Sequence, residues 1–307
     1  MHEAFVQRLR GELACPVATA VPLAPLNTFG IGGPAGCLVT PGTVADVSTT
    51  LHLCCEARIP LYVLGAGSNI IVPDEGIAGV VLRLAGGLSE ISMTGGLIRA
   101  AGGVLDRELA EFAWQHQVTG FEWVYDIPGT VGGAIYMNAG NNDGEVSQTV
   151  VAVTWVAPDG TIHESELSDL ELGYRQSRFQ GTPGIIVEAL FQPLGSDDPD
   201  RIRRRMAAIQ ALRQSKFPPE TLCAGSIFKR PPGHFAGRLI EAAGCGGMGV
   251  GGALVSPKHK GFIVNTGGAT AADVLRLIAE VKARVLEDSG VQLTTEVVSF
   301  APFLSFA

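Results

Sequence analysis

The sequence feature that most constrains the fold is a short glycine loop, GAGSN at residues 65–69, which joins two apolar runs. The run before it, residues 61–64, and the runs after it, residues 70–72 and 79–84, have the composition of buried strands. A Rossmann dinucleotide site needs a third glycine and a helix directly after its glycine loop. Because this loop leads into a strand, that fold is disfavoured. The loop can bind a phosphate through successive backbone N–H groups, but a plain hairpin turn explains the same residues.

Composition limits the class of protein and its partners. The 307 residues include 40 glycines and only 17% charged residues, which indicates many tight turns and close backbone approaches. The length is sufficient for two or three domains, and a hydrophobic share of 46% can fill a substantial core. The net charge of −8 creates no general attraction for nucleic acid or an anionic membrane. We therefore expect neither as a partner.

The N-terminal segment and the cysteines bear on location. Residues 13–45 carry no charge, but five prolines among them exclude a membrane-spanning helix. The first dozen residues hold four charged side chains and no apolar run of signal-peptide length. The six cysteines form no C-x-x-C pair and have no histidine at ligand spacing, which indicates reduced thiols and no metal site. We expect a cytoplasmic protein.

Helical and strand patterns alternate along the rest of the chain. A hairpin is predicted around Pro158-Asp159-Gly160, a further strand at residues 184–194, and a polar linker, SDDPD, at residues 196–200. The run IPGTVGGAIYMNAG at residues 127–140 has too much glycine and too many small side chains for a helix or an ordinary strand. Tight packing or close contact with a flat ligand would explain it. Helical patterns cover residues 44–58, 105–116, 200–214, 236–243 and 270–287.

Three polar residues suited to proton or anion chemistry interrupt apolar or turn segments: Arg175, Ser226 and Glu296. An arginine can hold a carboxylate in two parallel hydrogen bonds, a serine can deliver a proton to a strongly basic carbon, and a nearby glutamate can stabilise a developing enol. Ser226 does not fit a G-x-S-x-G nucleophile elbow, because Phe228 replaces the second glycine. Each residue also has a structural explanation, as an ion pair, a turn cap or a solvated strand residue. Spacing alone does not show that the three meet.

Seven segments taken together resemble the UDP-N-acetylenolpyruvoylglucosamine reductase family, also called the MurB family. They occur in the family's order and span nearly the whole chain, which makes the resemblance specific. The segments are NTFGIGGPA (27–35), LGAGSNIIV (64–72), IPGTVGGAIYMNAG (127–140), GYRQS (173–177), AGSIFKRPPGHFAGRLIEAAG (224–244), GGALVSPKHKGFIVN (251–265) and TEVVSF (295–300).

The resemblance implies an α+β fold in which two N-terminal domains of the vanillyl-alcohol-oxidase (PCMH) type bind FAD non-covalently and a C-terminal α+β domain binds substrate. The corresponding bounds are residues 1–85, 86–199 and 200–307, with the tail from about residue 295 to 307 returning to the FAD-binding part. The loop at 65–69 matches the family's pyrophosphate-binding turn, and the run at 127–140 matches the segment beside the isoalloxazine. The implied cofactor-binding residues are Leu64, Gly65, Ala66, Gly67, Ser68, Asn69, Ile127, Gly129, Thr130, Gly132, Gly133, Asn138 and Arg213.

The implied activity is reduction of UDP-N-acetylglucosamine enolpyruvate to UDP-N-acetylmuramate for peptidoglycan synthesis, in a ping-pong order that begins with NADPH. By the same resemblance, FAD N5 gives hydride to the methylene carbon and Ser226 protonates the neighbouring carbon, while Arg175 and Glu296 polarise the carboxylate and stabilise the enolate. We expect a monomer. The implied substrate-binding residues are Tyr174, Lys216, Lys229, Arg230 and Asn265.

The chain departs from the family pattern at Asn141-Asn142-Asp143 and at Thr295. Its short connection between Arg175 and the helix near residue 200 resembles the type II branch, which lacks the substrate-capping tyrosine loop of type I. Two other functions are compatible with much of the sequence. A flavin oxidase of the same superfamily would need neither NADPH nor Ser226, and a catalytically silent nucleotide-sugar-binding module would show no NADPH-driven turnover.

Overall fold

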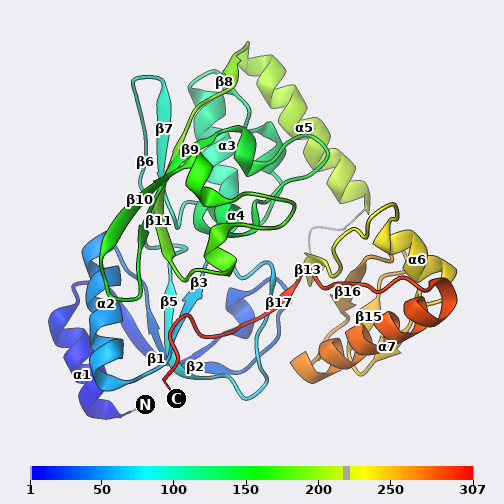
Figure 1. The fold of residues 1–307 in the computed structure, drawn as a ribbon, viewed down its shortest axis with the longest axis horizontal. Coiled ribbons are helices and arrows are strands. Elements are labelled where there is room, and N and C mark those ends of the chain that lie inside the picture. Colours follow the sequence, from blue (N-terminus) through cyan, green and yellow to red (C-terminus); the bar gives the residue numbers. More distant parts are fainter. Residues whose placement is uncertain (1, 217–221, 307) are drawn as a thin grey trace.

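The computed structural model describes residues 2–216 and 222–306, without the side chain of Lys216. Its strands and helices fall into three groups, each organised around one sheet (Figure 1). Short 3-10 helices lie in the connections, at Ala24–Leu26, Glu122–Val124, Val146–Gln148, Leu167–Leu170 and Arg178–Gln180.

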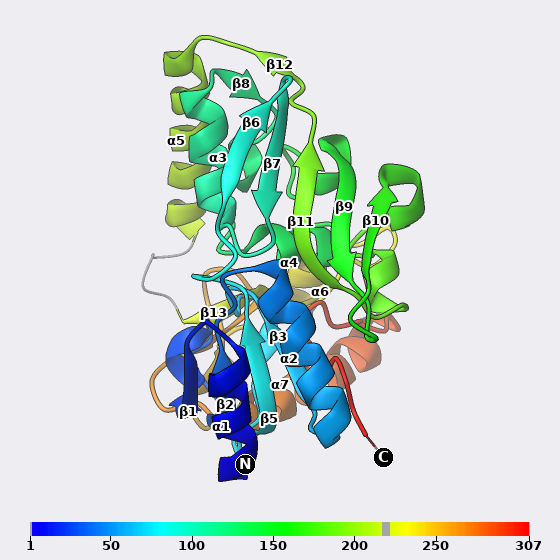
Figure 2. The ribbon, with the colours of Figure 1, turned by 90° about the vertical axis from the view of Figure 1, so that its left-hand side faces the viewer.

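The first sheet contains three parallel strands, β2, β5 and β3, and an antiparallel edge strand, β1. Two helices lie over one of its faces (Figure 2), and the second of them begins with the capping box formed by Thr43 and Asp46. The loop at residues 65–69 leads from β3 to β4 (Ile70–Ile71), and β4 pairs with β17 (Val298–Ser299) rather than with β3, so the hairpin-turn explanation of this loop is wrong. The elements are α1 (Glu3–Glu12), β1 (Val17–Pro22), β2 (Pro34–Val39), α2 (Val44–Ala57), β3 (Leu61–Leu64) and β5 (Ile77–Arg83).

The second sheet is antiparallel throughout its order β10-β9-β11-β7-β6. Helix α4 packs on β11 and β7, α3 packs on α4, and α5 packs on α3. The predicted hairpin is present as β9 and β10. The predicted linker at residues 196–200 instead contributes to a two-stranded ribbon with β8 and, through Asp198, caps α5. The elements are β6 (Ile91–Thr94), β7 (Leu97–Ala101), α3 (Asp106–Gln115), β8 (Val118–Thr119), α4 (Val131–Met137), β9 (Val150–Val156), β10 (Ile162–Glu166), β11 (Ile185–Phe191), β12 (Gly195–Ser196) and α5 (Pro199–Lys216).

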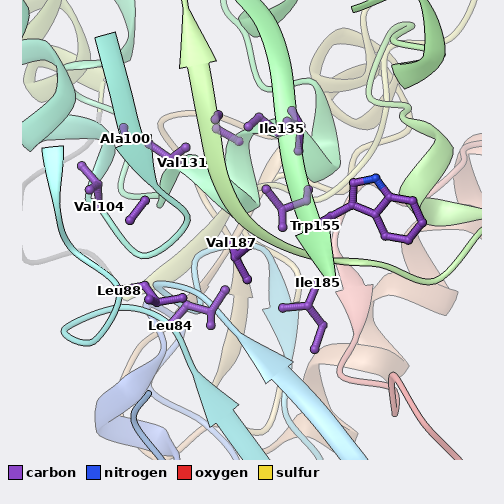
Figure 3. Packing of buried hydrophobic residues seen from close by; sticks show 14 of the residues in the cluster. Leu84, Leu88, Ala100, Val104, Val131, Ile135, Trp155, Ile185 and Val187 are labelled. Atoms are coloured by element: carbon purple, nitrogen blue, oxygen red, sulfur yellow. The ribbon is translucent and has the colours of Figure 1, made fainter. Parts of the chain in front are cut away.

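The first two groups share one hydrophobic core. Figure 3 shows Leu84 and Leu88, which follow the first sheet, close to Ile185 and Val187 of β11. Val131 of α4 belongs to the same cluster. Full burial of such side chains contributes about 1.5–3 kcal/mol each, so these two groups form one packed body.

Helix α4 lies in the glycine-rich run at residues 127–140, where the sequence predicts no helix. Thr130 is its N-cap, and the Thr130 hydroxyl accepts a hydrogen bond from the N–H of Gly133 at 3.3 Å. A Cβ atom on Gly132 would lie 3.0 Å from the carbonyl oxygen of Gly102. The small residues are therefore required for close packing against the second sheet, and this packing outweighs glycine's low helix propensity.

The third group has its own core and a small sheet of order β13-β16-β15-β14. Its long helix begins after Thr270, which forms a capping box with Asp273. No helix in the described part of the chain has the length and apolar character to cross a membrane. The elements are β13 (Cys223–Ser226), α6 (Ala236–Ala242), β14 (Gly249–Val250), β15 (Ala253–Val255), β16 (Phe262–Asn265) and α7 (Ala271–Ser289).

The C-terminal segment leaves the third group and returns to the first (Figure 1). Strand β17 (Val298–Ser299) pairs in parallel with β4 (Ile70–Ile71). Farther along, Leu304 forms a β-bridge with Leu61, and Phe300 packs 5.3 Å from the ring of Tyr62. The last residues of the chain thus hold the first and third groups together.

Candidate active site

A cavity of about 1140 Å³ is lined by residues from all three groups. Its volume is slightly above the usual range for small-molecule sites, about 300–1,000 Å³. The wall contains all three residues singled out for chemistry and twelve of the thirteen predicted cofactor-binding residues, the exception being Asn138. Continuous stretches of the wall are residues 63–70, 126–130, 139–143, 183–186, 222–226 and 298–303.

The glycine loop at residues 65–69 forms one part of the wall. Gly67 has φ +68°, and a Cβ atom there would lie 2.5 Å from the carbonyl oxygen of Leu26, so glycine is required by the protein's own packing. Among the described residues, no backbone acceptor or side chain receives a hydrogen bond from the N–H groups of residues 65–68. A run of unpaired N–H groups beside a large cavity fits a phosphate.

The run that precedes α4 forms a second part of the wall, and it approaches the glycine loop closely. A Cβ atom on Gly65 would lie 2.6 Å from the hydroxyl oxygen of Thr130. Likewise, a Cβ atom on Gly129 would lie 2.2 Å from a carboxyl oxygen of Asp106. Because Gly65 and Gly129 have no side chains, the segments that form this part of the cavity wall can lie so close together.

Arg175 is held in the cavity wall by a strained turn and several hydrogen bonds. Its φ of +53° is rare for a residue with a side chain, and Gly173 and Gln176 close the turn with two backbone hydrogen bonds of 3.1 Å. The guanidinium group donates to the carbonyl oxygen of Gly140 at 2.6 Å and to a carboxylate oxygen of Glu296 at 2.6 Å. Such strain is characteristic of functional positions.

The ion pair of Arg175 and Glu296 is largely shielded from solvent, with side-chain exposures of 20% and 15%. Glu296 follows a short pairing in which Thr295 bridges Phe228, and its own N–H donates to the carbonyl oxygen of Ile227 at 2.8 Å. Ser226 is the residue before Ile227, and it ends strand β13 in the same wall. The structure therefore brings Arg175, Ser226 and Glu296 to one cavity.

Three predicted substrate-binding residues lie beside the Arg175 turn, outside the cavity wall. The Tyr174 hydroxyl accepts a hydrogen bond from the N–H of Arg230 at 3.1 Å, and the Lys229 ammonium donates to the carbonyl oxygen of Arg175 at 3.3 Å. The guanidinium of Arg230 stacks 3.9 Å from the ring centre of Phe235. The cationic side chains of Lys229 and Arg230 therefore lie next to the Arg175 turn but do not line the cavity.

Three further predicted residues are placed differently. Asn265 does not line the cavity, and its amide group bonds to the backbone of residues 29, 267 and 269. Asn138 caps the end of α4; it donates to the carbonyl oxygen of Gly173 at 2.9 Å and so supports the Arg175 turn. The side chain of Lys216 lies outside the described part of the structure.

Two acidic residues of the cavity wall, Asp126 and Asp106, were not predicted from the sequence. Arg213, predicted for the cofactor, forms an ion pair of 3.3 Å with Asp126, and both line the cavity. Burial raises the pKa of Asp126, although Arg213 and Arg107 oppose the shift. Asp106 also lines the cavity, and an acidic residue in the first turn of a helix is too common to stand out.

The fold and site define a class of flavoprotein. A model described as "FAD binding domain" matches residues 35–166, and one described as "UDP-N-acetylenolpyruvoylglucosamine reductase, C-terminal domain" matches residues 217–300. A solved alkyldihydroxyacetonephosphate synthase shares the fold at 17% identity, with a TM-score of 0.50 over 64% of this chain and 41% of that one. The chain therefore contains an FAD-binding domain joined to a second α+β unit, and the predicted fold class is confirmed.

The chain belongs to the UDP-N-acetylenolpyruvoylglucosamine reductase family. It is 44% identical over 269 residues to the reductase of Clostridium botulinum (strain Alaska E43 / Type E3), which covers 88% of each chain. It is 41% identical over 298 residues to that of Bradyrhizobium sp. (strain ORS 278), covering 96% of this chain and 94% of that one. The structure of the enzyme from Thermus caldophilus matches with a TM-score of 0.78 and 34% identity, over 94% of this chain and all of that one. The family predicted from the sequence is confirmed.

Proposed function

We propose that this protein reduces UDP-N-acetylglucosamine enolpyruvate to UDP-N-acetylmuramate, with FAD as cofactor and NADPH as the electron donor. The single observation that supports this most is the meeting of Ser226 with the Arg175–Glu296 ion pair at one large cavity. The pair comes from segments 121 residues apart. A plain binding module has no need to bring a proton donor to a shielded ion pair.

The residues that line the cavity are suited to binding FAD. The loop at 65–69 offers unpaired N–H groups for the diphosphate, and the run at 127–133 offers a smooth, glycine-rich wall for a flat ring system. Arg213 adds a cation to the same cavity. When bound, FAD supplies hydride chemistry that no amino-acid side chain provides.

The roles of the three residues follow from their chemistry. Addition of hydride to the methylene carbon of the enolpyruvyl group leaves a basic carbon next to the carboxylate, and Ser226 donates the proton that completes the lactyl ether. Arg175 attracts the substrate carboxylate, and Glu296 fixes the orientation of the guanidinium through the 2.6 Å hydrogen bond. The low exposure of both side chains strengthens these interactions.

Substrate recognition by Tyr174, Lys229 and Arg230 belongs to the same proposal. Their position beside the Arg175 turn suits contact with the nucleotide diphosphate or the sugar at the cavity mouth. Asn265 has less support, because its amide group is already bonded to backbone. Asn138 is better supported as a positioning residue for Arg175 than as a cofactor ligand.

We propose three domains that divide near residues 85 and 216, the second division following helix α5 and not residue 199 as the sequence predicts. Each of the three larger sheets lies within one of these spans, and the tail after residue 295 contacts the first domain. Helix α5 was expected at the start of the third domain, but it packs on α3, so we assign it to the second. A monomer in the cytoplasm completes the proposal; six free cysteines support a reducing location.

The test is an anaerobic pair of half-reactions on the purified, full-length protein. Addition of NADPH should bleach the flavin absorption, and subsequent addition of the enolpyruvyl substrate should restore it with formation of the lactyl ether. Restoration by oxygen but not by the substrate would favour a flavin oxidase. A protein that contains no flavin and cannot be reconstituted with FAD would overturn the proposal.

A further inference from the structure

Asp106, the first residue of α3, has an unusual buried carboxyl group beside the cavity. The residue lines the cavity but is only 1% exposed. Within the described part of the chain, neither of its carboxyl oxygens has a hydrogen-bond partner. A buried polar group without a partner is costly, and in native structures such groups are rare.

The backbone fixes this carboxyl group against the glycine-rich run. The N–H of Asp106 donates to the carbonyl oxygen of Gly129 at 3.1 Å, and the neighbouring Leu105 forms a β-bridge with Thr130. One carboxyl oxygen lies 2.2 Å from where a Cβ atom on Gly129 would be. Gly129 thus leaves room for the carboxyl group at the part of the wall that we assign to the flavin.

On its other side, Asp106 has mainly apolar neighbours. It borders a small void of about 10 Å³ whose lining includes Leu109, Phe121, Trp123 and Val131, with Thr149 as the one other polar residue. This burial raises the pKa of Asp106 well above its usual range. The neutral carboxyl group is consequently favoured, and unlike a carboxylate it has an O–H donor.

We propose that Asp106, as a neutral carboxylic acid, donates a hydrogen bond to an acceptor atom of the bound flavin nucleotide. The inference rests on the proposed function, because it assigns the cavity to FAD. Asp106 would then be a cofactor-binding residue, and its carboxyl group would have no hydrogen-bond partner among the described residues of the protein because its partner is the cofactor. The carboxyl group would then be unsatisfied without the cofactor and satisfied with it.

Two substitutions separate hydrogen-bond donation from packing. Asp106→Leu removes the donor at similar size, and Asp106→Asn keeps an N–H donor without a titratable group. We expect Asp106→Leu to weaken FAD binding about tenfold and Asp106→Asn to remain within about threefold of wild type. The measurement is the Kd of FAD for the full-length protein, obtained from the quenching of flavin fluorescence on binding.

Leu109→Ala is the matched control for a purely structural effect. Leu109 lies on the same helix and borders the same void, but it does not line the large cavity. We expect Leu109→Ala to lower the melting temperature of the FAD-free protein without weakening FAD binding. By contrast, Asp106→Leu should leave that temperature unchanged or higher, because it removes an unpaired buried group.

Unchanged FAD binding in Asp106→Leu would overturn the inference while the proposed function stands. Equal losses in Asp106→Leu and Asp106→Asn would also overturn it, since the donor would then be irrelevant. Failure of wild type itself to bind FAD would instead overturn the proposed function.

A spectroscopic measurement on the natural side chain covers the case in which Asp106→Leu does not fold. Infrared difference spectra of wild type should show a protonated carboxyl C=O band that shifts when FAD binds and that is missing in Asp106→Asn. A band that does not shift, or no such band, would contradict the inference.

Discussion

Glu296 and Asp106 are both carboxyl residues in the wall of one cavity, yet their surroundings are opposite. Glu296 has a guanidinium partner at 2.6 Å, whereas Asp106 has no partner in the described structure and lies among apolar side chains. A paired carboxylate suits the stabilisation of charge, and an isolated carboxyl group suits neutral hydrogen bonding. The comparison shows that environment, rather than residue type, decides what a carboxyl group in this cavity can do.

The largest expected effect concerns the proton donor beside the Glu296 pair. Ser226→Ala should slow flavin reoxidation by the enolpyruvyl substrate by about 10²–10⁴-fold, because a general acid is lost. Reduction by NADPH should be retained. Stopped-flow measurement of both half-reactions checks this, with Ser299→Ala as the control serine of the same cavity wall. Equal loss in both half-reactions would exclude the role of Ser226.

The same chemical change at the two carboxyl groups tests the comparison directly. Glu296→Gln should reduce the rate of reoxidation by substrate about 10²-fold, since it removes the charge that orients Arg175. Asp106→Asn should leave this rate within about threefold of wild type, because neutral Asp106 and Asn both provide a donor. Comparable losses in the two variants would mean that the carboxyl groups act alike.

A smaller effect is expected from the residue that supports the Arg175 turn. Asn138 has φ +40°, so Asn138→Gly keeps the backbone conformation and removes only the side-chain hydrogen bonds to Gly173 and from Ser147. We expect about a tenfold loss in kcat/KM with an unchanged Kd for FAD. Weaker FAD binding in this variant would restore the assignment of Asn138 to the cofactor.

The smallest effect is on stability, and its size depends on pH. The folded-state pKa of Asp106 is raised above the unfolded value of about 3.9. Between these two values, the unfolded chain releases a proton that the folded chain keeps, so wild-type stability falls as pH rises. The stability of Asp106→Asn does not fall in this way, because Asn has no ionisable group.

The FAD-free Asp106→Asn protein should accordingly melt a few degrees above wild type near pH 8, and the difference should shrink toward pH 4. Scanning calorimetry over this pH range measures it. Asp126 and Arg213 also line the cavity, but both proteins contain them, and their contribution cancels to first order. A difference that does not vary with pH would show that Asp106 is ionised in the folded protein.

Local sequence signals predicted much of the fold. Apolar periodicity predicted helices at residues 44–58 and 270–287, which correspond to α2 and α7, and the apolar runs on either side of residues 65–69 are strands. Helix α4 was not predicted because its glycines disfavour a helix. They are needed for close packing, as where Gly132 contacts the backbone of Gly102. Such contacts join distant segments and leave no periodic pattern.

The candidate site was predictable only in part. The resemblance identified Arg175, Ser226 and Glu296, but the residues themselves do not show that the Arg175 turn and the segment that precedes β17, 121 positions apart, form a 2.6 Å hydrogen bond. The buried state of Asp106 also depends on Gly129 and on the opposing apolar side chains. Both are properties of tertiary packing.

The return of the C-terminal segment has a consequence for biosynthesis. Strand β17 and the neighbouring Glu296 are synthesised long after β4, with which β17 pairs. During translation, the first two sheets can pack before residues 296–299 leave the ribosome. The cavity wall, by contrast, is completed only when these residues have emerged, so a nascent or prematurely terminated chain that lacks them already has the glycine loop but not the carboxylate partner of Arg175.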